Sequence, residues 1–70
     1  MNKNNSDNNE TRKIQLLNNR GNNYIKLGQY NDAINDLNIV LELEHDNNKA
    51  LYRRGLASFN LKKFRESLEG

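Results

Sequence analysis

The chain has 70 residues, of which 34% are hydrophobic, with a net charge of +2 and no cysteine or proline. This length allows at most one small domain with a modest apolar core. The lack of cysteine excludes disulfides and thiolate metal sites, and the polar start and the absence of a long apolar run predict a cytoplasmic protein without a signal peptide or membrane span.

Residues 1–10, MNKNNSDNNE, form an asparagine-rich run with no apolar residue beyond Met1. Such a run cannot bury enough apolar surface to offset the entropy lost on ordering. We therefore expect a disordered tail over 1–10 and a helical domain over 11–70.

After the tail, apolar and small residues recur at spacings of three and four, which is typical of one helix face. The members of this face are Ile14, Leu17, Gly21, Tyr24 and either Leu27 or Gly28. Gly28 is expected to end the helix in a left-handed turn. Asn31 is suited to cap the next helix, with Asp32 near the positive end of its dipole. We predict helices over 11–28 and 31–44.

The second half of the chain follows a polar turn, HDNN at 45–48. We predict a third helix over 47–61, an interruption at Lys62 and Lys63, and a short fourth helix over 64–69. The aromatic side chains are expected to pack between helices or to line a groove between them: Tyr24, Tyr30, Tyr52, Phe59 and Phe64.

The two halves repeat with an offset of 34 residues. Identical pairs at this offset are Arg20/Arg54, Gly21/Gly55 and Leu27/Leu61, and conservative pairs include Tyr30/Phe64 and Ala33/Ser67. A period near 34 indicates a helix–turn–helix repeat, and small residues at matched positions favour close helix crossings. We expect repeat one at about 14–47 and a truncated repeat two at about 48–70.

The truncated second repeat leaves several apolar side chains with few partners, namely Phe59, Leu61, Phe64 and Leu68. Repeat arrays bury such surface against a neighbouring unit or a polar capping helix. We expect a weak homodimer through this edge, with fraying of residues 62–70 in the monomer.

The stretch GNNYIKLGQYNDAINDLNIVLEL, residues 21–43, resembles the tetratricopeptide repeat. The residues in signature positions are Gly21, Tyr24, Leu27, Gly28, Tyr30, Ala33 and Leu43, whereas His45 stands where the family usually has proline. The resemblance implies an all-α fold of antiparallel helix–turn–helix repeats, with about one and a half to two repeats of a right-handed superhelical solenoid. It also implies a protein-binding module rather than an enzyme.

The stretch NNKALYRRGLASFNLKKF, residues 47–64, resembles the third repeat of tetratricopeptide co-chaperones attached to immunophilins and protein phosphatases. In that subgroup a carboxylate clamp binds the acidic C-terminal tails of cytosolic heat-shock chaperones. Lys49 and Arg53 match the lysine and arginine of the clamp, and Asn19 matches its asparagine one repeat earlier. The other two clamp positions belong to a repeat that would precede Met1.

The spacing of Lys49 and Arg53 supports the same chemistry independently. Residues at i and i+4 share a helix face, so both cationic groups can converge on one carboxylate, with Asn19 as a further hydrogen-bond donor. The alternative is a solvated pair on a self-associating scaffold that binds no peptide. Nucleic-acid binding is a weaker interpretation that would use the basic residues Arg53, Arg54, Lys62, Lys63 and Arg65.

No pattern in the sequence predicts catalysis, a metal or a cofactor. His45 is the single histidine, and no cysteine accompanies it. No carboxylate is paired with an obvious nucleophile, and the glycines lack the spacing of a phosphate-binding loop.

Overall fold

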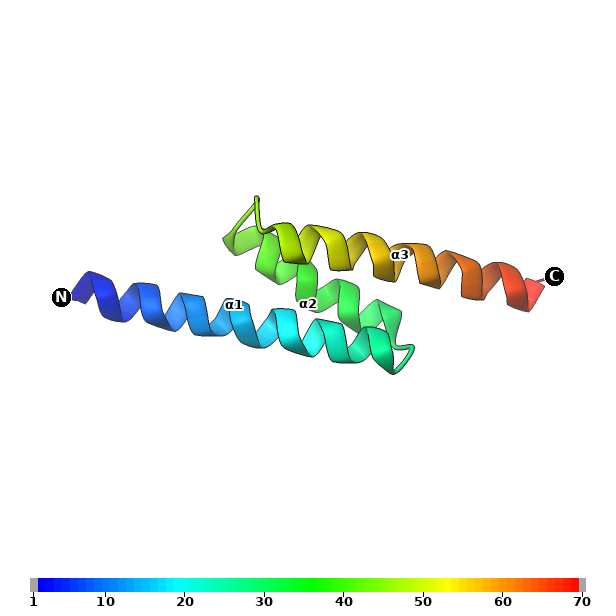
Figure 1. Cartoon of the computed structure of the whole chain (residues 1–70), viewed down its shortest axis with the longest axis horizontal. Helices are drawn as coiled ribbons and strands as arrows, with labels where there is room; N and C mark the ends of the chain where they lie inside the picture. The colour runs from blue at the N-terminus through cyan, green and yellow to red at the C-terminus, as the bar shows by residue number, and fades with distance from the viewer. Residues whose placement is uncertain (1, 70) are drawn as a thin grey trace.

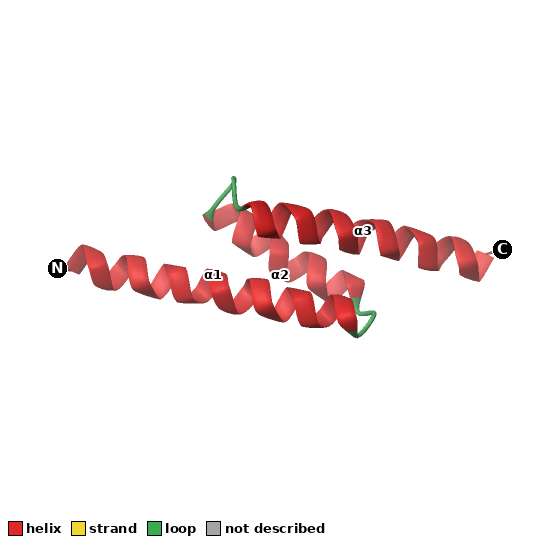
Figure 2. Ribbon diagram, in the orientation of Figure 1, coloured by secondary structure: helices red, strands yellow, loops and turns green. Residues whose placement is uncertain are grey.

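The structure, a computed structural model, describes residues 2–69 and the side chains of residues 9–69. Three helices make up this part of the chain, with no strand: α1 (Asn2–Lys26), α2 (Tyr30–Leu43) and α3 (Asn48–Glu69) (Figures 1 and 2). α1 and α2 form an antiparallel hairpin, and α3 runs back along α2 in the direction of α1 (Figure 1). The predicted all-α, helix–turn–helix repeat fold is confirmed, with one and a half repeats.

The turn between α1 and α2 depends on Gly28. Its backbone has φ of 80°, a left-handed conformation that glycine adopts without steric cost, as the sequence predicts. The carbonyl of Gln29 then accepts the amide of Ala33 at 3.1 Å, so the hydrogen bonds of α2 begin at Gln29. The prediction that Asn31 caps this helix is therefore wrong, because Asn31 already lies inside it. Asp32 lies in the first turn, as predicted.

The core lies where α2 is packed between α1 and α3. Its buried apolar side chains are Ile14, Ala33, Leu37, Val40, Leu41, Ala50 and Ala57. Gly21 allows α1 and α2 to approach closely, because a Cβ at this position would lie 3.1 Å from Cγ and Cδ2 of Leu37. The predicted close crossing at Gly21 and Ala33 is confirmed. On α3, the small residues Ala50 and Ala57 are fully buried.

α3 continues without interruption through Lys62 and Lys63. The prediction of a separate fourth helix over 64–69 is therefore wrong. Lysine is a good helix former, and this point of the second repeat lacks the glycine that ends α1 in the first repeat. Gly55 consequently meets no second helix, since a Cβ placed there would have no atom within 4 Å.

The last turns of α3 extend beyond the α1–α2 turn (Figure 1). Large apolar side chains of α3 remain exposed: Tyr52 at 71%, Phe59 at 60%, Phe64 at 54% and Leu68 at 71%. The expectation that Tyr52, Phe59 and Phe64 pack between helices is wrong, because no helix in the described part of the chain covers them. The shortage of partners expected for Phe59, Phe64 and Leu68 is confirmed, whereas Leu61 is half-buried.

The first turns of α1 extend beyond the α2–α3 turn at the opposite end of the molecule (Figure 1). The helical backbone begins at Asn2, although the sequence predicts a disordered tail over 1–10, of which Met1 lies outside the described residues. Helices gain most of their stability from tertiary packing, and asparagine is a poor helix former. The disorder of this segment in solution stays a prediction.

Candidate functional site

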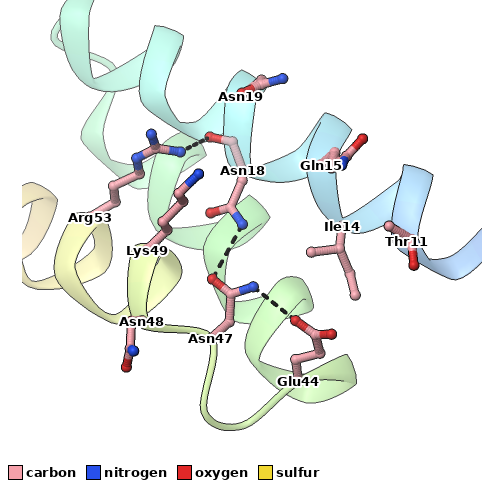
Figure 3. Close-up of a pocket in the computed structure, with 10 residues that line it drawn as sticks. All are labelled: Thr11, Ile14, Gln15, Asn18, Asn19, Glu44, Asn47, Asn48, Lys49 and Arg53. Atoms are coloured by element: carbon pink, nitrogen blue, oxygen red, sulfur yellow. Dashed lines mark hydrogen bonds between the residues drawn. The ribbon is translucent and has the colours of Figure 1, made fainter.

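A groove of about 550 Å³ lies between α1, the α2–α3 turn and the first turns of α3 (Figure 3). α1 lines it with one face, made of Thr11, Ile14, Gln15, Asn18 and Asn19. The opposite side is lined by Glu44, Asn47, Asn48, Lys49 and Arg53. The structure thus brings the three predicted site residues to one groove, and their role in binding stays a prediction.

Lys49 and Arg53 lie one turn apart on α3, on the face that borders the groove (Figure 3). Arg53 is half-buried, and its Nη1 donates a hydrogen bond of 3.0 Å to the backbone carbonyl of Asn18. Lys49 is exposed, and its ammonium forms no hydrogen bond or ion pair with the residues that the structure describes. The groove therefore contains one cation oriented by the protein and a second one available to a ligand.

Asn19 lies on the α1 side of the groove and is exposed to solvent. In Figure 3 its side chain points away from Lys49 and Arg53. Lys49 and Arg53 thus form a pair, whereas Asn19 reaches a ligand bound to them only after a side-chain rotation. Such rotations are fast for an exposed side chain.

A chain of side-chain amides joins α1 to the α2–α3 turn beneath the cations. Nδ2 of Asn18 donates to Oδ1 of Asn47 at 3.4 Å, and Nδ2 of Asn47 donates to Oε1 of Glu44 at 2.9 Å (Figure 3). Oδ1 of Asn47 also accepts the amide of Ala50 at 2.9 Å, which caps the N-terminus of α3. These contacts fix the position of the first turn of α3, and with it the position of Lys49.

Asn18 was not predicted as a site residue. It is only 6% exposed, and its Oδ1 has no hydrogen-bond partner among the described residues. A signal was available in the sequence, because Asn18 lies four residues after Ile14 and three before Gly21, inside the apolar stripe of α1. A polar residue within such a stripe is expected to have a specific partner.

The charges of the groove are distributed along its length. Arg53 and Lys49 lie at the level of Asn18 and Asn19, whereas Glu44 lies beyond Asn47, toward Ile14 (Figure 3). Glu44 was likewise not predicted as a site residue, since its sequence neighbours indicate only a solvated helix end. The groove therefore has a cationic end and an anionic end.

Other basic residues hold the helices together. Nε and Nη2 of Arg20 donate to the two carboxylate oxygens of buried Asp36 at 2.7 and 2.8 Å. These hydrogen bonds and the negative charge of Asp36 raise the pKa of the Arg20 guanidinium above its ordinary value. Arg54, the equivalent of Arg20 in the second repeat, donates to Oδ1 of Asn38 on α2 at 2.9 Å. Neither arginine lines the groove.

The described residues show neither a metal-binding cluster nor a membrane-spanning helix. Among them, no group of three or more histidine, cysteine or acidic side chains is arranged to hold a metal ion. In the same part of the chain, no helix combines the length and the apolar character needed to cross a membrane.

Comparison with known proteins identifies the repeat. A family model described as a TPR repeat matches residues 21–62, which is more than half of the chain. No curated protein and no solved structure matches the chain significantly. The matched range starts at the glycine of the α1–α2 crossing and covers the end of α1, all of α2 and much of α3, whereas the α1 residues that line the groove precede it. The chain therefore belongs to the tetratricopeptide repeat family.

Proposed function

We propose that this tetratricopeptide repeat chain is a peptide-binding module that holds acidic C-terminal tails through Lys49, Arg53 and Asn19. The observation that carries the proposal is that all three residues line the same groove of about 550 Å³. Tetratricopeptide repeats are protein-interaction elements, so a groove between their helices is the expected place for a peptide.

The groove offers donors suited to a terminal carboxylate. The hydrogen bond from Nη1 to the Asn18 carbonyl orients the guanidinium of Arg53 and leaves its other donors available. The ammonium of Lys49 lies on the same helix face and adds a second positive charge. A carboxylate bound between them would make charge-assisted hydrogen bonds, which are about twice as strong as neutral ones.

The partner we propose is the C-terminal tail of a cytosolic heat-shock chaperone, which would make the chain part of a cytoplasmic co-chaperone. The support is the match of Lys49, Arg53 and Asn19 to three positions of the carboxylate clamp.

The test is fluorescence anisotropy with a labelled Met-Glu-Glu-Val-Asp peptide that has a free C-terminus. Lys49→Ala is expected to weaken binding by at least about tenfold, since a lost charge-assisted hydrogen bond is worth about 1.5–3 kcal/mol. The control is Lys62→Ala, which removes the same charge from an exposed position of α3 outside the groove. The same peptide with a C-terminal amide should bind more weakly to the wild-type chain.

Arg53→Ala is expected to weaken binding as well, but it also removes the contact with Asn18. Circular dichroism of this variant checks that the helices are intact. Absence of binding, or equal affinity for the wild type, Lys49→Ala and Arg53→Ala, would show that the proposal is wrong.

A second candidate function, self-association as a scaffold, is favoured by the exposed large side chains of α3. Tyr52, Phe59, Phe64 and Leu68 leave a substantial apolar surface uncovered among the described residues. Covering each of these side chains by a second copy would gain up to about 1.5–3 kcal/mol. Sedimentation velocity is expected to show a mass that rises with concentration, and Phe59→Ser with Phe64→Ser should abolish the rise. A chain that is monomeric at all concentrations would contradict this function.

A further inference from the structure

Asn18 is a buried polar residue in the wall of the groove, and its side-chain oxygen has no partner. The residue is 6% exposed, and its Oδ1 accepts no hydrogen bond from the described residues. We propose that this oxygen accepts the backbone N–H of the peptide's C-terminal residue, so that the groove recognises the end of a chain rather than any carboxylate. The proposal rests on the proposed function, because it takes Lys49 and Arg53 as the site of the terminal carboxylate.

The hydrogen bonds of Asn47 determine which atom of the Asn18 amide is free. Oδ1 of Asn47 accepts the backbone amide of Ala50 at 2.9 Å, and its Nδ2 donates to Oε1 of Glu44 at 2.9 Å. The Asn18 atom that contacts this Oδ1 at 3.4 Å is therefore a donor, which makes it Nδ2. The free atom of Asn18 is the oxygen, and a donor such as an N–H group is needed to satisfy it.

Leaving this oxygen without a partner lowers the stability of the free protein. A buried polar atom without a hydrogen bond has lost its interaction with water and gained no other in return. The large majority of buried polar atoms in folded proteins do have a partner. An apolar side chain at the same position of α1 would avoid this loss of stability. An unpartnered acceptor in the wall of a groove therefore points to a ligand that supplies the donor.

Asn18 lies directly beside the proposed carboxylate site. Its backbone carbonyl accepts Nη1 of Arg53 at 3.0 Å, and in Figure 3 its side-chain oxygen points toward the Lys49 side of the groove. In any peptide the backbone donor nearest to the terminal carboxylate is the N–H on the same Cα atom. A carboxylate held by Lys49 and Arg53 therefore brings this N–H toward Asn18. The oxygen is covered in this structure, but exposed side chains at the groove, such as Lys49, change rotamer fast enough to admit a ligand.

The N–H can be removed from the ligand without changing its charge. Met-Glu-Glu-Val-malic acid has malic acid in place of the last aspartic acid, so its last linkage is an ester and every carboxylate is kept. The control ester has 2-hydroxyisovaleric acid in place of valine, which moves the ester one linkage earlier and keeps the terminal N–H. We expect the terminal ester to bind about threefold to tenfold more weakly than the control ester, the size expected for one neutral hydrogen bond.

The variant that tests the residue is Asn18→Leu, measured by isothermal titration calorimetry with the two esters. Leucine keeps the branched shape of asparagine without an acceptor, and the backbone carbonyl that bonds Arg53 remains. Asn47 keeps the amide of Ala50, so no buried polar atom loses its last partner. The thermal midpoint should therefore stay the same or rise, while the preference for the control ester should disappear. A loss of stability alone would weaken binding of both esters equally and leave the preference unchanged.

Asn23→Leu is the matched control variant. Asn23 is exposed on α1 and does not line the groove, so this variant should keep the wild-type preference.

The outcomes separate the proposal from the function on which it rests. If the wild type binds the two esters equally, and both more tightly than the C-terminal amide of Met-Glu-Glu-Val-Asp, the role of Asn18 is overturned while carboxylate binding stands. A preference that persists in Asn18→Leu overturns the role of Asn18 in the same way. If Met-Glu-Glu-Val-Asp binds no more tightly than its C-terminal amide, the proposed function fails, and the proposal fails with it. A preference that is lost in Asn18→Leu and kept in Asn23→Leu supports both.

Discussion

The first and second repeats carry equivalent residues in different surroundings. Gly21 lies against Leu37 of α2, whereas Gly55, 34 residues later, has no neighbour for an added Cβ. Arg20 forms a bidentate ion pair with buried Asp36, whereas Arg54 bonds only to the amide of Asn38. The difference arises because α2 covers α1 in the first repeat and no second helix covers α3 in the described part of the second. A repeat pattern therefore identifies equivalent positions, but the burial of a residue at such a position depends on whether a neighbouring helix covers it.

The largest expected difference between the two regions concerns their apolar side chains. Leu37 is fully buried between the helices, so Leu37→Ala should lower the free energy of unfolding by about 2–5 kcal/mol, enough to unfold much of a domain this small. Phe64→Ala should change it by less than about 0.5 kcal/mol, because Phe64 is exposed. Urea denaturation followed by circular dichroism measures both. Comparable losses for the two variants would mean that residues beyond Lys63 belong to the folded core.

Replacing each of the two equivalent glycines, Gly21 and Gly55, by alanine should change stability in opposite directions. Gly55→Ala should stabilise α3 by about 0.5–1 kcal/mol, because alanine is the better helix former and the added methyl meets no atom. Gly21→Ala gains the same propensity but places a methyl 3.1 Å from Leu37, and overpacking of a buried site costs about 1–3 kcal/mol. We expect Gly21→Ala to destabilise, with the thermal midpoints of the two variants on opposite sides of the wild type. Equal shifts would show that the close crossing at Gly21 is absent in solution.

The helix caps give the smallest expected difference. Asn47 accepts the amide of Ala50 and begins α3, so Asn47→Ala should cost about 0.5–2 kcal/mol. Asn31 lies inside α2 and α2 begins without a side-chain cap, so Asn31→Ala should be neutral within about 0.5 kcal/mol. Thermal unfolding of both variants checks this ranking. A greater loss of stability for Asn31→Ala than for Asn47→Ala would show that Asn31 caps α2 in solution.

Features of the fold that depend on local residue chemistry could be predicted from the sequence. The left-handed turn at Gly28 and the close crossing at Gly21 follow from local residue chemistry, and the structure confirms both. The predicted apolar face of α1 is wrong at Leu27, which is 69% exposed because it lies in the turn after the helix. The predicted break at Lys62 and Lys63 was inferred from the repeat alone. Lysine is a good helix former, so neither residue ends the helix locally, and α3 continues through both of them.

For the groove, the sequence identified cations but not their supporting residues. Lys49 and Arg53 are recognisable from a spacing of four on one helix, and Asn19 from the repeat offset. Asn18 joins the groove through hydrogen bonds to Asn47 and Arg53, which lie 29 and 35 positions away in the sequence. Glu44 joins it through Asn47, the partner of Asn18. The position of Glu44 depends on how the α2–α3 turn is placed beside α1. Such packing is a tertiary property that no local pattern specifies.

We propose that the groove, and not the exposed end of α3, is the surface that binds a partner. The most direct test is a titration of the ¹⁵N-labelled chain with Met-Glu-Glu-Val-Asp, followed by NMR chemical shifts of the backbone and side-chain amides. We expect the shift changes to concentrate at 11–19 and 47–53, which line the groove, with the shifts at 59–69 unchanged. Shifts centred on Phe59, Phe64 and Leu68, or no shifts at millimolar peptide, would contradict it.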